Sequence, residues 1–577
     1  MTGKTGVSGF GSETESDLPW LRAYPAKVAW DQRFTPRPVY AFLDDAAARL
    51  PKNPCTNFLG KVMSYGEIQA HVRHATAGFQ RLGIGKGSKV GLFLPNSPTF
   101  LVAYYAVLRA GGTVVNFNPL YSIEELEHQV RDSGTTLMVT LDLKVLFNKV
   151  EALLERGLLE RAVVASFPSL LPPVKSAMFR IAKSQELANV SSSPVRDKVI
   201  GQRDLMTNDG RFSPVDIAPE QDLAVLQYTG GTTGTPKGAM LTHANLSTNV
   251  EQVASWAGAL EYGSERVMGI LPFFHVFAMT VVMNFGVSRA SEIILVPKFE
   301  LNDTLKLINQ VKPTLMPGVP TLFNAILNHR KIKSYDLSSL KFCLSGGAAL
   351  PVEVKRGFET LTGCKLVEGY GLSETSPVVS ANPPDGPVKD GSIGMPLPGT
   401  RLSIRSLEDP SKVLGLNEDG EICIAGPQVM PGYWNKPEET REAFAGDYFR
   451  TGDIGHMDED GFVFIVDRLK DMINCSGFKV YPRRVEEALY EHAAVEEVVV
   501  IGIPNKHRGE APKAFVKLRE GMQATPQELM EHLRPKLSKI EMPEEIEIRN
   551  SLPKTMIGKL SKKELKAEEA AKAKSHS

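Results

Sequence analysis

A loop rich in glycine and threonine at residues 227–243, QYTGGTTGTPKGAMLTH, constrains this chain more than any other stretch. The apolar run 223–226 before it predicts a buried strand, and the sequence after it is helix-like. Glycines let a backbone approach a ligand closely and turn several N–H groups toward one point. Threonine hydroxyls add donors, and Lys237 adds a mobile positive charge. The loop therefore predicts a cradle for phosphate oxygens, with a flexible surface turn as the alternative.

The order of residues in this loop disfavours one class of phosphate site. A Walker A motif needs Gly-Lys-Ser/Thr in succession, whereas this loop has Pro236-Lys237-Gly238. A P-loop kinase or GTPase is therefore not expected. The predicted nucleotide contacts in the loop are Thr229, Gly230, Gly231, Thr232, Thr233, Gly234 and Lys237.

Length, charge and cysteine content indicate the number of domains and the kind of protein to expect. A chain of 577 residues is too long for one core, so we expect at least two domains. Lys+Arg and Asp+Glu both number 66, so the net charge is zero and nucleic acid is not an expected partner. Five scattered cysteines without a CxxC predict reduced, mostly buried thiols in a cytoplasmic protein. No apolar run reaches the roughly 18 residues of a membrane span.

Strand and helix patterns alternate in two series, at about 63–140 and 267–344, which predicts βαβ units and mainly parallel sheets. We expect an α/β fold with a large N-terminal domain, 31–469, built from two stacked α/β sublobes with the ligand between them. A small β-barrel or antiparallel sheet follows from about Arg401. A smaller, mobile α+β domain then spans 470–562. The ends are predicted to be a disordered leader, 1–30, that is no signal peptide, and a charged tail, 563–577.

Several later motifs have the residue types that a nucleotide needs. Small residues at Gly346-Gly347-Ala348 would let a flat ring lie on the backbone. In EGYGLSE, residues 368–374, Tyr370 offers an aromatic face and Glu374 a hard carboxylate suited to Mg²⁺ beside phosphates. Each motif alone has an ordinary structural alternative, such as a tight turn or a solvated acid.

The loop, the 368–374 segment, RTGDIG…DGFVFIVDRLKD and PKTMIGK together resemble the signatures of adenylate-forming enzymes, which include acyl-CoA synthetases, luciferases and peptide-synthetase adenylation domains. The resemblance covers about 35–562 and is greatest to bacterial long-chain fatty-acid–CoA ligases. It implies ATP-dependent activation of a fatty acid to acyl-CoA through an acyl-adenylate, with release of AMP and pyrophosphate. It also implies ATP, Mg²⁺ and coenzyme A as cofactors and co-substrates.

The resemblance assigns roles to matching residues. Glu374 would hold magnesium, Asp453 the ribose, Arg468 a phosphate or the ribose, and Lys559 the α-phosphate and acyl carboxylate. Lys470 falls on the hinge position, and His275 lies beside the acyl pocket unless it is an ordinary core residue. The remaining assigned residues are Gly346, Gly347, Ala348, Glu368, Gly369, Tyr370, Gly371, Ser373 and Ile465 for ATP or AMP, and Ser476, Gly477, Phe478 and Lys479 for coenzyme A. Thr229, Lys237, Glu374, His275 and Lys559 form the expected catalytic set.

Substrate and partner predictions leave alternatives open. The acyl pocket is expected from Phe273, Phe274, Val276, Phe277 and Met279 with the 318–322 region, and chain length stays open. The rivals are ligases for medium-chain or aryl acids, a fatty-acyl-AMP ligase that loads a carrier protein, and a nucleotide-binding regulator. A basic, apolar segment at 161–185 suggests peripheral contact with the inner membrane, against an ordinary packed amphipathic helix. A homodimer is also considered.

Overall fold

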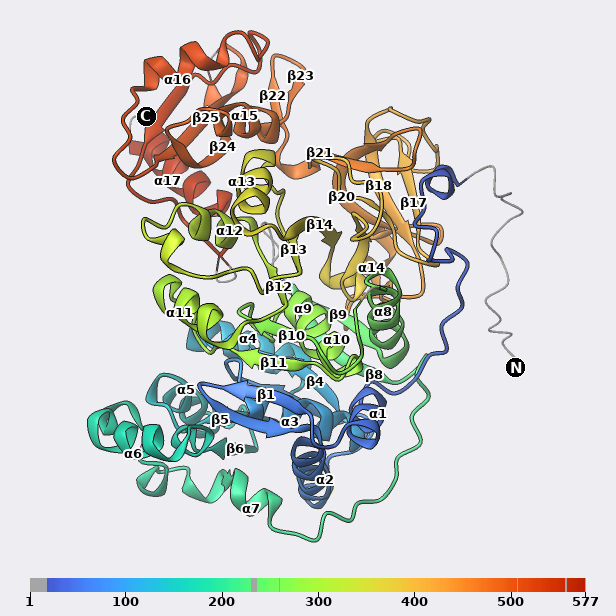
Figure 1. Ribbon diagram of the computed structural model, residues 1–577, viewed down its shortest axis with the longest axis vertical. Helices are drawn as coiled ribbons and strands as arrows, with labels where there is room; N and C mark the ends of the chain where they lie inside the picture. The colour runs from blue at the N-terminus through green and yellow to red at the C-terminus, as the bar shows by residue number, and fades with distance from the viewer. Residues whose placement is uncertain (1–17, 230–235, 259, 506, 556–557, 576–577) are drawn as a thin grey trace.

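The computed structural model describes residues 18–229, 236–258, 260–505, 507–555 and 558–575. Its first lobe is a seven-stranded sheet of order β7-β6-β5-β3-β4-β8-β9, mainly parallel as predicted (Figure 1). The strands are β3 (Lys89–Leu92), β4 (Thr113–Asn116), β5 (Leu137–Leu141), β6 (Arg161–Ala165), β7 (Val199–Gly201), β8 (Leu223–Thr229) and β9 (Lys237–Thr242). The crossover helices include α3 (Pro98–Arg109), α4 (Ile123–Ser133) and α5 (Lys144–Glu155).

The second lobe is a nine-stranded sheet of order β16-β15-β14-β13-β12-β10-β11-β1-β2. Its parallel strands are β10 (Arg266–Gly269), β11 (Glu292–Leu295), β12 (Leu315–Gly318), β13 (Phe342–Gly346) and β14 (Lys365–Gly371), with antiparallel β15 (Val378–Ala381) and β16 (Met395–Pro396) at one edge. The two lobes are not successive blocks of sequence. The hairpin of β1 (Pro54–Phe58) and β2 (Lys61–Ser64) joins this sheet, because β1 pairs in parallel with β11.

The apolar segment 276–288 is helical but divided. It consists of α9 (Val276–Ala278), a π-helical turn at Met279–Asn284 and α10 (Phe285–Ser288), and it packs near α8 (His243–Trp256). The π-helical residues are all buried. Among the described residues, no helix has the length and apolarity to cross a bilayer.

Two smaller sheets complete the chain. Strands β17 (Arg401–Arg405), β18 (Gly420–Ala425), β19 (Phe444–Ala445), β20 (Tyr448–Met457) and β21 (Val463–Arg468) form the antiparallel sheet. The C-terminal sheet contains β22 (Ile473–Cys475), β23 (Phe478–Val480), β24 (Val495–Asn505), β25 (Gly509–Leu518) and β26 (Glu545–Ile548), covered by α15 (Pro482–Tyr490), α16 (Pro526–Leu533) and α17 (Lys562–Ser575). The large apolar core ends at Val463 and a separate core begins at Ile473, on either side of Lys470.

The prediction of a disordered leader at 1–30 is wrong for its second half, while residues 1–17 lie outside the described part. Trp20 is 2% exposed and packs beside Trp30, whose indole N–H donates to the Thr400 carbonyl at 3.1 Å. The Tyr24 hydroxyl donates to the Pro396 carbonyl at 2.9 Å. Large aromatic side chains gain more from burial than an ordered segment loses in entropy. This segment therefore folds onto the small sheet.

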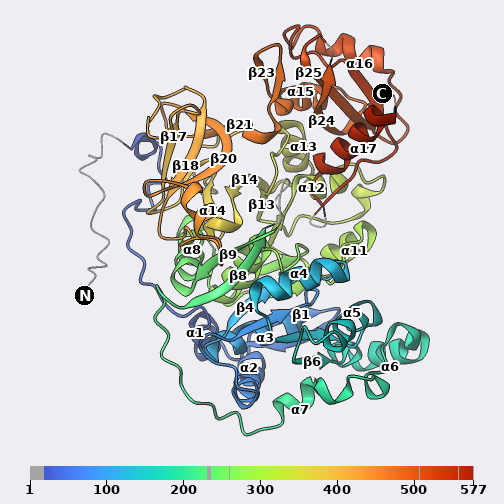
Figure 2. The same ribbon diagram turned by 180° about the vertical axis from the view of Figure 1, so that it is seen from behind.

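The boundary between the C-terminal domain and a frayed tail is also wrong. Leu565 on α17 is fully buried with Phe515 in one apolar cluster. Lys513, only 3% exposed as a side chain, forms an ion pair with Glu569 on the same helix at 3.1 Å. The tail helix is therefore part of the C-terminal domain (Figure 2).

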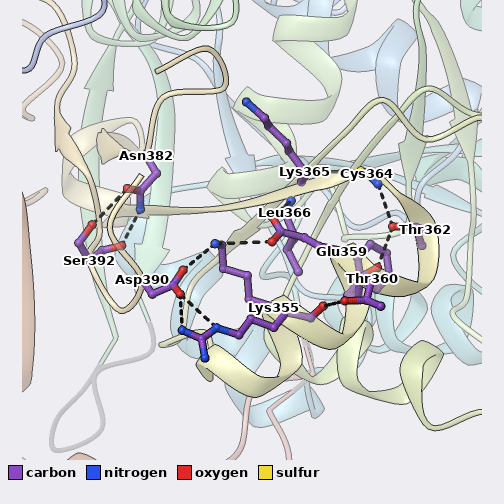
Figure 3. Close-up of polar contacts among 12 residues, drawn as sticks. Lys355, Glu359, Thr360, Thr362, Cys364, Lys365, Leu366, Asn382, Asp390 and Ser392 are labelled. Atoms are coloured by element: carbon purple, nitrogen blue, oxygen red, sulfur yellow. Dashed lines mark hydrogen bonds and ion pairs between the residues drawn. The ribbon is translucent and has the colours of Figure 1, made fainter. Parts of the chain in front are cut away.

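Strand β14, which leads into the 368–374 motif, is fixed at its start by polar contacts with α13 (Val352–Thr362), as Figure 3 shows. The Glu359 carboxylate accepts the Leu366 N–H at 2.9 Å. Lys355 on the same helix binds Asp390 at 2.7 Å and lies 3.6 Å from Glu359. These contacts set where the far end of β14 emerges into the site.

Candidate active site

The glycine- and threonine-rich loop joins two antiparallel strands. Thr229 at the end of β8 lies opposite Lys237 at the start of β9, and its hydroxyl donates to the Lys237 carbonyl at 3.4 Å. The predicted contacts Gly230, Gly231, Thr232, Thr233 and Gly234 lie outside the described residues. The helix expected after 227–243 is confirmed, since α8 begins at His243, and strand β9 lies between the glycines and this helix. The ends of β8 and β9 thus present a hydroxyl and an ammonium group next to each other.

Lys237 and Glu374 are brought together by a residue that the sequence analysis missed. The Lys237 ammonium lies 4.9 Å from the centre of the Tyr433 ring, and the Tyr433 hydroxyl donates to Glu374 at 2.9 Å. Burial raises the pKa of Glu374, while the hydrogen bond from Tyr433 and the charges of Arg468 and Lys237 oppose that rise. The segment 431–434 pairs its backbone with β9, so its local sequence gave no sign of this contact.

Glu374 suits one hard cation beside phosphates. Magnesium in such sites takes one or two carboxylates plus phosphate oxygens, and the described contacts engage only one of the two Glu374 oxygens. The neighbouring Ser373 lies with it in a short 3₁₀ turn, Ser373–Thr375, and is half-buried.

The ends of β13 and β14 form a close-packed backbone floor. A Cβ atom on Gly346 would lie 3.0 Å from the Phe277 ring, and one on Gly371 would lie 2.0 Å from the Pro377 carbonyl oxygen. Gly369 would place a Cβ 3.0 Å from Leu344. Larger residues would therefore displace the neighbouring elements, which explains the glycines where a flat ring could lie.

Tyr370, Asp453 and Arg468 form one network across two sheets, in which Asp453 is buried and Arg468 is half exposed. The Tyr370 hydroxyl donates to Asp453 Oδ2 at 2.6 Å, and Arg468 Nε lies 3.0 Å from Asp453 Oδ1. Asp453 and Arg468 are also register partners on β20 and β21. The structure thus unites three predicted site residues that are up to about a hundred positions apart.

Lys559 lies in the same site, although it belongs to the C-terminal domain. A Cβ atom on Gly347 would stand 2.5 Å from Lys559 Cε and 2.8 Å from its ammonium nitrogen. Burial and the charge of Arg468 lower the pKa of Lys559 to about 8, and Asp453 partly opposes this. The two domains therefore meet in an arrangement that places the Lys559 side chain against Gly347.

His275 faces the same region in its neutral form. Its Nδ1 accepts the N–H of Phe277 at 3.3 Å, which caps the start of α9. Burial and the charge of Lys559 lower the pKa of His275 to about 3. With Nδ1 acting as acceptor, the ring proton of the neutral imidazole resides on Nε2, where it can be donated to a ligand.

Of four other predicted site residues, two have hydrogen-bond partners and two lie between the domains. Glu368 is 5% exposed and accepts the Leu350 N–H at 3.1 Å, and burial raises its pKa to about 7. The Ile465 carbonyl accepts a hydrogen bond from Arg483 at 2.7 Å. Lys470 lies in the short turn Leu469–Asp471 that joins the domains, and burial lowers its pKa. Ala348 lines a cavity between the two domains.

The four residues assigned to coenzyme A are not at this site. Ser476 and Gly477 both have positive φ, 55° and 86°, and form the tip of the β22–β23 hairpin. Phe478 is 61% exposed. Figure 1 shows this hairpin at the far edge of the C-terminal domain, well separated from β13 and β14.

A small apolar cavity of about 40 Å³ lies behind the strand ends. It lies between α8, the π-helical segment and strands β10, β12 and β13. Its lining is Val253, Ala257, Leu260, Val267, Val281, Phe285, Leu315, Met316, Pro317, Phe342 and Leu344. The expected pocket residues 276–279 belong to the same helical segment as Val281, but the α8 residues were not anticipated.

Known proteins share this arrangement over nearly the whole chain. A long-chain-fatty-acid–CoA ligase of Bacillus subtilis (strain 168) is 44% identical over 96% of this chain and 99% of its own length. A ligase of the same name from Escherichia coli O157:H7 is 36% identical over 96% of this chain. The crystal structure of ATP-bound MatB from Rhodopseudomonas palustris superposes with a TM-score of 0.79 at 27% identity, covering 92% of this chain and 98% of that one.

Family models match both domains. The AMP-binding enzyme model matches residues 43–434, and the model of the AMP-binding enzyme C-terminal domain matches residues 484–559. The first match includes the hairpin, the glycine floor and Tyr433, and the second ends at Lys559. Because the residues that meet in the site come from both matched regions, this chain belongs to the AMP-binding enzyme family.

Proposed function

We propose that this protein activates a long-chain fatty acid to acyl-CoA through an acyl-adenylate, with ATP consumed and AMP and pyrophosphate released. The observation that most supports this is the position of Lys559 against Gly347, in a site that also contains Lys237, Glu374 and His275. The curated relatives of similar length are named long-chain-fatty-acid–CoA ligases.

The first step is attack of the fatty-acid carboxylate on the α-phosphorus of ATP, which forms the acyl–phosphate bond and breaks the bond to pyrophosphate. Negative charge grows on phosphate oxygens in this step. Lys559 and Lys237 would oppose that charge, and a fixed cation in a site shielded from water is worth far more than one in bulk water. His275, neutral with a proton on Nε2, would orient the acyl carboxylate by a hydrogen bond. Mg²⁺, when bound through Glu374, supplies further neutralisation of the phosphates.

The second step needs a different arrangement of the domains. The CoA thiolate attacks the acyl carbonyl and AMP leaves. The loop 476–479 lies far from the strand ends while Lys559 occupies the site, so the C-terminal domain would turn about Lys470 to bring that loop in. Ser476 and Gly477 would then present a narrow turn to the pantetheine chain.

The proposed activity is tested by supplying ATP, magnesium and CoA with a panel of carboxylic acids and measuring AMP and acyl-CoA. Palmitate should be converted faster than a hydroxycinnamate or a short acid. AMP formation with a carrier protein but not with CoA would favour the carrier-loading alternative. Absence of AMP with every acid would reject the proposal.

The apolar cavity behind the strand ends is the proposed start of the acyl site. Val281→Phe would fill it, and losing burial of three or four methylenes at about 0.8 kcal/mol each predicts a roughly hundredfold lower kcat/KM for palmitate. Octanoate should lose far less. Val145→Phe, at a valine that is 59% exposed on α5, is the matched control. An equal loss for both acids would place the acyl chain elsewhere.

Lys559→Ala should separate the two half-reactions. Loss of one preorganised cation predicts a fall of about 10²-fold or more in acyl-adenylate formation. Conversion of preformed acyl-adenylate to acyl-CoA should stay near the wild-type rate, because Lys559 leaves the site before that step. Equal losses in both half-reactions would contradict the assigned role.

The pKa of Lys559 predicts a pH dependence. Only the protonated amine opposes phosphate charge, and its pKa in the free enzyme is about 8. Since kcat/KM reports the free enzyme, kcat/KM for ATP in adenylation should fall as pH rises above about 8. Lys559→Arg should remove this fall, because guanidinium stays charged. A wild-type profile that is flat up to pH 10 would argue against it.

We also propose a cytoplasmic enzyme that contacts the inner face of the membrane through α6 (Pro173–Ala182). This helix has no buried residue, and Val174, Met178 and Ile181 on it are 72%, 63% and 83% exposed. Arg180 and Lys183 add positive charge beside them. An apolar face flanked by cations suits an anionic lipid surface.

Vesicle sedimentation tests the role of α6. Wild-type protein should partition onto phosphatidylserine-containing vesicles more than onto neutral ones, and less at high salt. Ile181→Ser with Arg180→Glu should abolish the difference, whereas Val413→Ser, at an exposed valine on the small sheet, should not. Unchanged partitioning of the α6 variant would remove the membrane proposal without affecting the enzymatic one.

A further inference from the structure

Helix α12 (Pro320–Leu327) and the residues just after it present a row of polar groups to the C-terminal domain. The Thr321 hydroxyl donates to the Gly558 carbonyl at 2.6 Å, and Asn324 Nδ2 donates to the Glu496 carbonyl at 2.8 Å. Arg519 donates to the Asn328 side-chain oxygen. Residues three and seven positions apart share one helix face, so these contacts form a single line, here called the α12 strip: Thr321, Asn324 and Asn328.

The α12 strip acts one residue away from the catalytic lysine. Thr321 holds the carbonyl of Gly558, and Lys559 follows directly. Gly558 has φ of +84°, a conformation open to glycine and strained for other residues. The backbone there turns sharply, so anchoring its carbonyl fixes the direction in which the Lys559 side chain leaves the chain.

The rest of this interface is loosely packed. A cavity of about 180 Å³ lies between α12 and the start of α13 on one side and α15, β24 and Lys559 on the other. Its wall includes charged groups such as Glu486 and Lys562, which form an ion pair at 3.3 Å. Unfilled space forfeits packing contacts, so the directional hydrogen bonds of the α12 strip contribute to how well this interface stays closed.

Contacts close to Lys470 are expected to change less between the two poses than the contacts of the α12 strip. Arg483 binds the Ile465 carbonyl at 2.7 Å, and its backbone N–H binds Asp467 at 2.8 Å. These partners lie within five residues of Lys470, where a rotation moves atoms least. Helix α12 lies apart from strand β21, which leads into that turn, in both views of the fold (Figures 1 and 2).

We propose that Thr321, Asn324 and Asn328 are positioning residues that hold the C-terminal domain in its adenylating pose and release it for transfer to CoA. This rests on the proposed two-step activity and assigns the pose to three side chains that do not touch the reacting atoms. Their loss lowers the occupancy of the adenylating pose and leaves the chemistry of each pose unchanged.

Thr321→Val and Asn324→Ala test this in the full-length enzyme. Each lost hydrogen bond predicts a roughly two- to tenfold lower kcat for acyl-adenylate formation. Thioester formation from preformed acyl-adenylate and CoA should be unchanged or faster. Asn309→Ala is the matched control, since this exposed asparagine on α11 (Leu301–Val311) accepts the Asp336 N–H within the same lobe. It should change neither half-reaction.

A charge reversal beside the α12 strip provides a second test that does not depend on how well those variants fold. Arg330, two residues after Asn328, forms an exposed ion pair with Glu520 of the C-terminal domain. Arg330→Glu should lower adenylation by about two- to fivefold, since exposed pairs contribute little. The double variant Arg330→Glu with Glu520→Arg should restore it, which a folding defect would not allow.

The outcomes separate the two proposals. A wild-type enzyme that makes no acyl-CoA from any acid rejects the proposed function. A wild-type enzyme that does so, with α12-strip variants that lower both half-reactions equally or neither, rejects the role of the α12 strip alone.

Discussion

The position of Lys559 against Gly347 is the contact on which the adenylating arrangement depends. The glycine is required twice, because its φ is +82° and because a Cβ atom would lie 2.5 Å from the lysine. A side chain at position 347 would therefore require the flexible end of Lys559 to shift. The pairing of β13 with β14 and the packing of the C-terminal domain against their ends together align these two residues.

The charges around this contact are arranged for a polyanion. Arg468 and Lys559 lie close enough for each to disfavour the charge of the other, and Asp453 only partly compensates. A triphosphate would supply the missing negative charge. In the free enzyme this pose holds two cations near one another, which costs free energy that bound nucleotide would offset. Nucleotide binding and domain closure are thus coupled by electrostatics.

Local sequence was sufficient for the parallel strands and for most of the site. The strand and helix alternation predicted at about 63–140 includes parallel strands such as β4 and β5, because a buried parallel strand is a short apolar run. The glycine floor, Tyr370 and Asp453 follow from motifs whose residue types match their chemistry. Lys559 could be assigned only through resemblance to a family, since a lysine in a charged tail has no distinguishing local pattern.

The features that local sequence does not predict depend on residues that are distant along the chain. The β1–β2 hairpin joins the second sheet through β11, about 235 positions later, and periodicity has no information on such pairing. Trp20 and Leu565 lie in segments near the ends of the chain, and each is buried against residues that are distant in sequence or belong to another element. Tyr433 was missed because its role arises from a strand-like pairing with β9 and not from its own segment.

A domain interface that must open in every catalytic cycle is constrained differently from a core. If α12 met the C-terminal domain through leucines and phenylalanines, closure would be stable, but the hairpin that bears Phe478 would stay far from the acyl-adenylate. A few hydrogen bonds define the geometry of the closed pose. The unfilled cavity of about 180 Å³ limits how stable that pose is. Hydrogen bonds suit this purpose because water can replace each of them at little net cost once the interface opens. Under the proposed two-step reaction, the polar composition of the α12 strip suits an interface that closes and opens in turn.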